Sequence, residues 1–188
     1  MSGTYKNFWS LNTDEVVVAG KLRDFFKKDV EVMMPLNAQL KDIDLMAVNL
    51  QNRRVATIQV KGSRAYEPSK SERDDFGDGS AGWFFLDKGK IEKSTADFFV
   101  FLVYVIVKNE KQGRRYFEPH FITVKTDRFN ELCKQYKVLH TRYSFYIWIS
   151  PSTKTAFDFR DEKARGRMDL SAYLDDQGLE QIKKELTS

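Results

Sequence analysis

The chain has 188 residues, of which 41% are hydrophobic and 31% are charged, and its formal net charge is +4. These values are typical of a folded protein and exclude a largely disordered chain, so we expect a single domain over residues 1–188. The mildly basic charge is compatible with a polyanionic partner, although many proteins without such a partner share it.

Apolar runs and cysteine content bear on location. The longest apolar run, residues 98–107, is too short for a helix that spans a bilayer. The first fifteen residues show no signal-peptide pattern, and Cys133 is the only cysteine, which excludes an intramolecular disulfide. We therefore expect a cytoplasmic protein with no membrane partner.

The first part of the chain predicts a helix, a β-hairpin and a long loop. Asn12 and Glu15 form a capping-box pattern at the start of a helix that continues to about Lys28. Two apolar runs, residues 43–50 and 55–61, flank a short polar stretch and predict the hairpin. Residues 62–82 are rich in Gly, Ser, Asp and Pro and predict a loop that covers or gates a substrate groove.

The rest of the chain predicts further strands and two helices. Strands are expected at 83–86, 98–107, 119–124, 144–149 and 156–159, and helices at 127–136 and 179–186. This order favours an α/β or α+β fold with a central mixed β-sheet flanked by helices.

Three polar residues fall on one face of the predicted hairpin. A turn centred in the polar stretch places Asp44 opposite Lys61 and Gln59 opposite Met46. Because side chains alternate along a strand, Asp44, Gln59 and Lys61 then share a face, and a register slip of two residues keeps them together. Such groups are costly to desolvate, so their clustering on a half-buried hairpin indicates a functional site.

Each of these residues also has a plainer interpretation. Gln59 and Lys61 could face solvent on an edge strand, and Asp42 shares the face of Asp44 and competes with it as the acidic member. Glu15 could serve only as the capping residue of the first helix.

The same residues carry a resemblance to a known family. Glu15 in a first helix, Asp44 at the start of a strand and Gln59-Val60-Lys61 on the next strand resemble the PD-(D/E)XK, or restriction-endonuclease-like, nuclease superfamily. The resemblance covers roughly the first third to half of the chain and implies a restriction-endonuclease-like core. Two positions depart from the pattern, since Ile43 replaces the usual proline and Gln59 replaces the usual Asp or Glu.

The resemblance implies a metal-dependent endonuclease that hydrolyses nucleic-acid phosphodiester bonds. Asp44, Gln59, the backbone carbonyl of Val60 and Glu15 would hold Mg²⁺, for which Mn²⁺ can substitute. Lys61 would orient the attacking water or stabilise the negative charge that develops at phosphorus.

The implied partner is nucleic acid, with DNA favoured over RNA. Ser63 and Arg64, directly after the motif, are candidates for phosphate contacts, although they could be ordinary loop residues. A homodimer would allow both strands to be cut. Because Gln59 lacks the charge of an acid, the alternative is an inactive nuclease-fold domain that binds nucleic acid or a protein partner, and a weaker one is another phosphate-handling enzyme.

Overall fold

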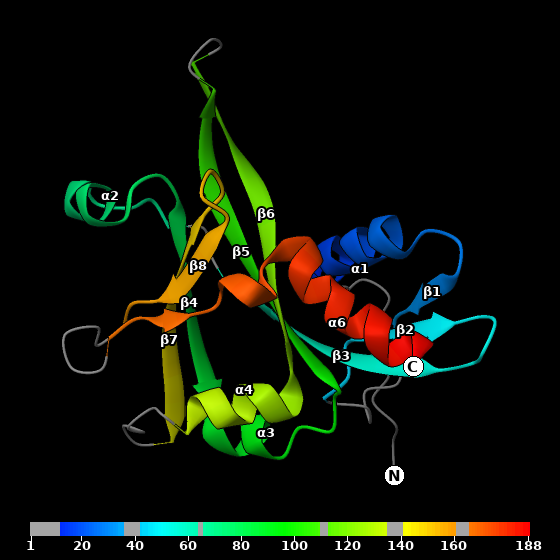
Figure 1. Cartoon of the computed structure of the whole chain (residues 1–188). Coiled ribbons are helices and arrows are strands. Elements are labelled where there is room, and N and C mark those ends of the chain that lie inside the picture. The colour runs from blue at the N-terminus through cyan, green and yellow to red at the C-terminus, as the bar shows by residue number, and fades with distance from the viewer. Residues whose placement is uncertain (1–11, 36–41, 64–65, 110–112, 135–140, 161–165) are drawn as a thin grey trace.

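A computed structural model describes residues 12–35, 42–63, 66–109, 113–134, 141–160 and 166–188 (Figure 1). In chain order its elements are α1 (Thr13–Phe26), β1 (Val30–Met33), β2 (Leu45–Asn49), β3 (Val55–Gly62), α2 (Lys70–Phe76), β4 (Ser80–Asp87), α3 (Lys88–Glu92), β5 (Phe98–Asn109), β6 (Arg114–Lys125), α4 (Thr126–Cys133), β7 (Arg142–Ser150), β8 (Thr155–Asp158), β9 (Met168–Asp169), the 3₁₀ helix η2 (Ser171–Tyr173) and α6 (Asp175–Thr187).

The central sheet is mixed, as the sequence predicts. Its strands lie in the order β1-β2-β3-β5-β6, and β3 pairs with β5 in parallel while the other neighbours are antiparallel. A second sheet has the order β4-β7-β8-β9 and is antiparallel throughout. The expectation of a mixed α/β fold is therefore confirmed.

One face of the central sheet is covered by helices. Buried side chains of α1 and α6, among them Leu22 and Ile182, pack against even-numbered residues of β3 and β5 such as Ile58 and Val100. In Figure 1 the two helices lie side by side against this part of the sheet. Removing these apolar side chains from water is the main force that holds the helices there.

The opposite face of the central sheet is covered mainly by a second sheet, whereas the sequence predicted helices beside the sheet. Odd-numbered residues of β5, including Phe99 and Phe101, pack against β4 and β7 of the second sheet and against Phe129 of α4. The central sheet thus has helices on one face and mainly another sheet on the other. The aromatic side chains between the layers explain much of the high Phe content of the sequence.

The predicted loop over residues 62–82 is only partly irregular. It contains α2, whose capping box joins Ser69 to Glu72, and it ends in the first residues of β4. The sequence Ser-Lys-Ser-Glu at 69–72 carries this helix-start signal, so the prediction of one continuous loop is wrong.

The strands β5 and β6 form a hairpin that is longer than predicted. They pair over their whole length, from Phe98↔Lys125 to Asn109↔Arg114. Because β3 accompanies β5 only as far as Leu102, the distal half of the hairpin continues beyond the central sheet, and it rises above the rest of the molecule in Figure 1.

Two further expectations can be compared with the structure. In the described part of the chain, no helix combines the length and hydrophobicity needed to cross a membrane. Cys133 lies on the inward side of α4, as predicted, and its burial raises the pKa of the thiol to about 12.

Candidate active site

The hairpin of β2 and β3 brings the predicted residues together in a register shifted by two. Met46 lies opposite Thr57 rather than Gln59, and the ladder ends at Leu45↔Ile58. The shift arises at the turn, where the side chain of Asn49 accepts hydrogen bonds from the backbone N–H groups of residues 51 and 52 and moves the turn centre toward β2. The predicted pairing of Asp44 with Lys61 is therefore wrong, and Asp44 lies just outside the ladder rather than in it.

Asp44 stands directly before β2 and continues the strand pairing with its side chain. Its backbone N–H donates to the carbonyl of Ile58, at 2.9 Å, and its carboxylate Oδ2 accepts from the N–H of Val60 at 2.8 Å. One carboxylate oxygen is therefore held in place by β3. The carboxylate group is fixed at the end of the ladder, beside the Gln-Val-Lys segment.

Successive residues of β3 point their backbone N–H and C=O groups alternately toward β5 and toward β2. On the β5 side, the N–H of Thr57 donates to the carboxylate of Asp97, and the carbonyl of Thr57 accepts from the N–H of Asp97. The carbonyl of Ile58 and the N–H of Val60 instead point toward β2, where both bond to Asp44. The N–H and C=O groups of one extended residue point to the same edge of a strand. The carbonyl of Val60 therefore faces the side on which Asp44 lies, beyond the end of the ladder.

Gln59 is buried on the same strand, with 5% of its surface exposed. Its Oε1 accepts a hydrogen bond from the hydroxyl of Ser94 at 3.4 Å, a long contact. In the parallel neighbour β5, residue Phe99 occupies the matching position on this face. A buried amide needs polar partners, and Ser94 supplies one.

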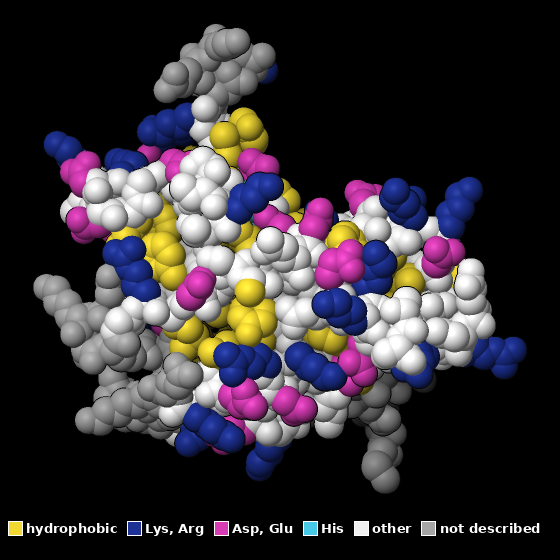
Figure 2. All heavy atoms as spheres, in the orientation of Figure 1, with side chains coloured by type: hydrophobic (Ala, Val, Ile, Leu, Met, Phe, Trp, Pro, Cys, Tyr) yellow, Lys and Arg dark blue, Asp and Glu magenta, His cyan; other side chains and the backbone are white. Residues whose placement is uncertain are grey.

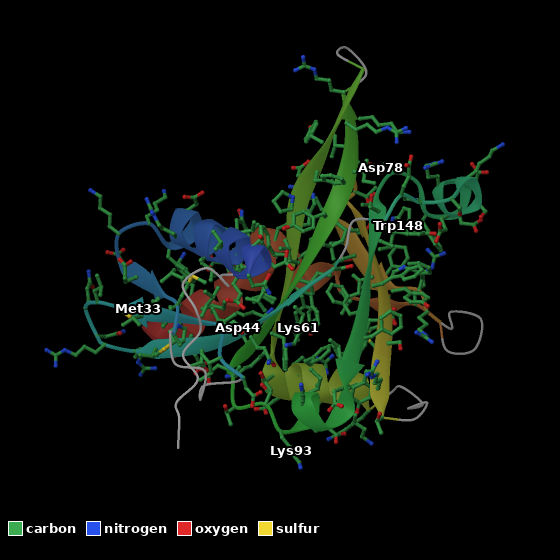
Figure 3. All side chains as sticks on the ribbon, turned by 180° about the vertical axis from the view of Figure 1, so that it is seen from behind. Met33, Asp44, Lys61, Asp78, Lys93 and Trp148 are labelled. Atoms are coloured by element: carbon green, nitrogen blue, oxygen red, sulfur yellow. The ribbon has the colours of Figure 1, made fainter. Side chains whose placement is uncertain are left out.

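Lys61 is half-buried and carries the clearest electrostatic signature of the site. Burial lowers the pKa of its ammonium below the ordinary value, and Lys90 of α3 acts in the same direction. Asp44, then Asp42, raise this pKa in opposition, and Figure 3 shows Asp44 and Lys61 beside each other in the middle of the molecule. The ion pairs recorded among the described residues do not include Lys61.

Glu15 occupies the first turn of α1, and only 5% of its surface is exposed. It raises the pKa of Lys61 more weakly than Asp44 and Asp42 do. The N-cap bond of α1 runs from the N–H of Asp14 to the side chain of Asn12 at 3.2 Å. Glu15 thus lies within electrostatic range of the predicted site.

The two residues predicted to contact phosphate have different outcomes. Ser63 is buried, and its hydroxyl oxygen accepts the N–H of Trp83 at 2.7 Å, which ties the end of β3 to β4. Arg64 lies outside the described residues. A phosphate contact by either residue stays a prediction.

Metal-binding capacity depends on the donor types in this region. No group of three or more His, Cys, Asp or Glu side chains in the described ranges is placed to hold a metal ion. The groups gathered at the end of the β2–β3 ladder are instead one carboxylate, one amide oxygen and one backbone carbonyl. All are oxygen donors, which is the ligand type that Mg²⁺ prefers, and they carry less negative charge than a site with three acids.

Two residues of the site were missed by the sequence analysis. Ser94 contacts Gln59, and Lys90 acts electrostatically on Lys61, and both come from the α3 region more than 25 residues further along the chain. No local pattern announces them, because only the parallel pairing of β3 with β5 carries this segment to the hairpin.

Comparisons of the chain with protein-family models, with curated proteins and with solved structures gave no match.

Proposed function

We propose that this protein is a metal-dependent endonuclease that hydrolyses phosphodiester bonds of nucleic acid, with DNA favoured over RNA. The observation that carries the proposal is the convergence of Asp44 with Gln59-Val60-Lys61 at one end of the β2–β3 ladder, beside a half-buried ammonium of lowered pKa. Perturbed titratable groups of this kind are concentrated at functional sites. The restriction-endonuclease-like core inferred from the sequence belongs to the same proposal.

Each residue has a chemical role in this proposal. The free carboxylate oxygen of Asp44, the amide oxygen of Gln59 and the carbonyl of Val60 would hold Mg²⁺ or Mn²⁺, with Glu15 approaching from α1. The bound ion would lower the pKa of a water and offset charge on the phosphoryl oxygens. Lys61 would donate hydrogen bonds to the phosphate as negative charge develops there, which its position near Asp44 permits.

Water exclusion would strengthen these interactions. Gln59 is buried and Lys61 half-buried, so charges act there through a medium that screens them less than bulk water does. Hydrolysis forms a bond between phosphorus and the water oxygen and breaks the P–O bond to the leaving group. The water gives up a proton, and the leaving oxygen takes one up. Lys61, which is a proton carrier, is the residue of this set that could orient the water.

A nicking assay on supercoiled plasmid DNA with Mg²⁺ or Mn²⁺ tests the proposal. We expect cleavage by the wild-type protein and a loss of at least about 100-fold in Asp44→Asn, which removes the charge of an ion ligand. Asparagine can still accept the N–H of Val60, so the fold should persist. The matched control is Asp74→Asn, on the exposed side of α2, which should leave cleavage unchanged.

Binding of Mn²⁺, measured by titration calorimetry, gives a readout that does not depend on turnover. Wild-type protein should bind Mn²⁺, and Asp44→Asn should bind it at least tenfold more weakly. Equal Mn²⁺ affinity in both proteins, or no cleavage by the wild type with either ion, would contradict the proposed activity.

The second candidate is a nuclease-fold domain without catalysis that binds nucleic acid or a protein partner. The neutral Gln59, whose oxygen is already engaged by Ser94, favours it. This candidate predicts salt-sensitive nucleic-acid binding that survives Asp44→Asn, with no cleavage by any form of the protein.

A further inference from the structure

The distal half of the β5–β6 hairpin, hereafter the arm, consists of residues 105–109 and 114–118. Beyond Leu102, where β3 ends its pairing, β5 runs seven residues further to Asn109. At about 3.3 Å per residue the arm therefore reaches on the order of 20 Å past the level of Lys61. It is a two-stranded ribbon that starts from the same sheet as the candidate active site (Figure 1).

The β6 strand of the arm exposes apolar surface, whereas Val105 and Val107 of its β5 strand pack against the core. Phe117 is 62% exposed and Tyr116 is 50% exposed, although both belong to a strand whose lower half is buried. Figure 2 shows hydrophobic and basic side chains next to each other close to the end of the arm. Exposed aromatic groups on a projecting element indicate a binding surface rather than packing.

Basic side chains lie on both faces of the arm, which also carries one acid, Glu118. Lys108 and Arg115 are directly opposite each other, and Arg114 belongs to the other face because side chains alternate along β6. Two cations in opposed positions repel each other, which destabilises a hairpin. Glu67 offsets part of this repulsion, since both its carboxylate oxygens accept from Nη1 of Arg115 at 3.0 and 3.1 Å.

We infer that the arm inserts into the major groove of duplex DNA and holds it beside the candidate active site. This inference rests on the proposed function and names the form of its substrate. A major groove about 12 Å wide admits a two-stranded ribbon, and phosphates border it on both sides, which matches cations on both faces of the arm. Phe117 supplies the apolar contact that thymine methyl groups accept. The major groove of duplex RNA is deep and narrow, so the arm discriminates against it.

The test is fluorescence anisotropy with labelled 20-base-pair DNA, without divalent metal, over a range of NaCl concentrations. Lys108→Ala/Arg114→Ala should weaken duplex binding by at least about tenfold and reduce the slope of log K against log[NaCl] by about 1.8, the value for two lost phosphate contacts. Arg115 is retained because it anchors the arm to Glu67.

The control is Lys28→Ala/Lys184→Ala, which removes two exposed charges that lie outside the β5–β6 hairpin, one after α1 and one in α6. It should bind duplex DNA with the wild-type affinity and slope. For single-stranded DNA, and likewise for duplex RNA of the same sequence, the affinities of the arm variant and the wild type should differ by no more than about twofold. Phe117→Ala, which leaves the charge unchanged, should weaken duplex DNA binding by about threefold or more.

Three results with the arm variant would overturn the inference. They are an unchanged salt slope, an equal loss of affinity for single-stranded DNA, and a shift from a dimeric wild type to a monomeric variant in sedimentation. The last would identify the occupant of the arm as a second copy of the chain. The proposed catalysis fails separately. Arm-dependent duplex binding without cleavage contradicts only the nuclease activity, whereas cleavage that is unaffected by the arm variant contradicts only the arm.

Discussion

The strands β3 and β5 run side by side in parallel, yet they use the same face of the sheet in opposite ways. In β3 this face carries Gln59 and Lys61, and at the matching positions of β5 it carries Phe99 and Phe101. The aromatic pair is covered by the second sheet and α4, whereas the polar pair meets Ser94, Asp44 and the electrostatic influence of α3. Paired positions on one face thus carry opposite side-chain chemistry.

This contrast indicates that the two strands were selected for different purposes. Aromatic burial stabilises the fold, while a desolvated amide and ammonium reduce stability unless they gain something from a ligand. Substitutions of Phe99 and Phe101 in β5 should therefore change stability, and substitutions of Gln59 and Lys61 in β3 should change activity with little loss of stability. The following predictions test that division.

The largest effect is expected for Phe101→Ala in β5. The ring is 1% exposed and contacts Phe84, Phe99 and Phe129 at centroid distances of 5.1, 6.1 and 4.9 Å. Its removal leaves a cavity that should cost about 3–5 kcal/mol of unfolding free energy, measured by urea denaturation. Phe85→Ala, at a site 55% exposed, should cost less than about 1 kcal/mol, and equal losses at both sites would contradict the layer arrangement.

The next effect is expected for Lys61→Met in β3. Cleavage of plasmid DNA should fall by at least about 100-fold, because a cation near the phosphate is lost. The melting temperature should stay the same or rise by about 2 °C, because a desolvated charge is replaced by an apolar side chain of similar length. Lys93→Ala, on the exposed side of the turn after α3 (Figure 3), should keep both properties. A Lys61→Met protein that unfolds easily would show that the lysine is structural.

A smaller effect, in the opposite direction, is expected for Gln59→Glu. The added carboxylate should raise the affinity for Mn²⁺ by about tenfold, because affinity of such sites follows the charge of the ligands. The hydroxyl of Ser94 can still donate to the new side chain. Calorimetric titration of both proteins checks this, and unchanged or weaker binding would place Gln59 outside the ion site.

The smallest effect concerns pH. Burial lowers the pKa of Lys61 below its ordinary value of 10.5. As pH rises, the cleavage rate should therefore begin to fall below pH 10.5. Between the lowered pKa and 10.5 the unfolded chain binds more protons, so this lysine's contribution to stability should increase with pH. Lys61→Arg keeps its charge throughout and should lack the alkaline decline, even if its rate is lower. The same decline in both proteins would assign it to another group.

Local signals in the sequence predicted several elements well. Asn12 marks the beginning of α1, and the apolar run at 98–107 marks β5. The shared face of Gln59 and Lys61 followed from strand alternation alone. The register did not, because the turn is set by the side chain of Asn49, whose hydrogen bonds depend on the folded turn.

Features that depend on distant contacts escaped the sequence analysis. The second sheet covers β5 because β4 crosses it closely at Gly82, where a Cβ atom would lie 2.8 Å from Val103. Ser94 and Lys90 enter the site only after β3 and β5 have paired. The protruding arm was also missed, since its length is defined by where β3 ends rather than by its own residues.

The single thiol of the chain has a practical consequence. Cys133 is 1% exposed and its raised pKa keeps it protonated at neutral pH, so it reacts slowly with maleimides and similar reagents. A cysteine introduced on the surface would therefore be labelled alone, without first replacing the native one. Spectroscopic reporters can in this way be attached at chosen points to follow how the molecule meets its ligand in solution.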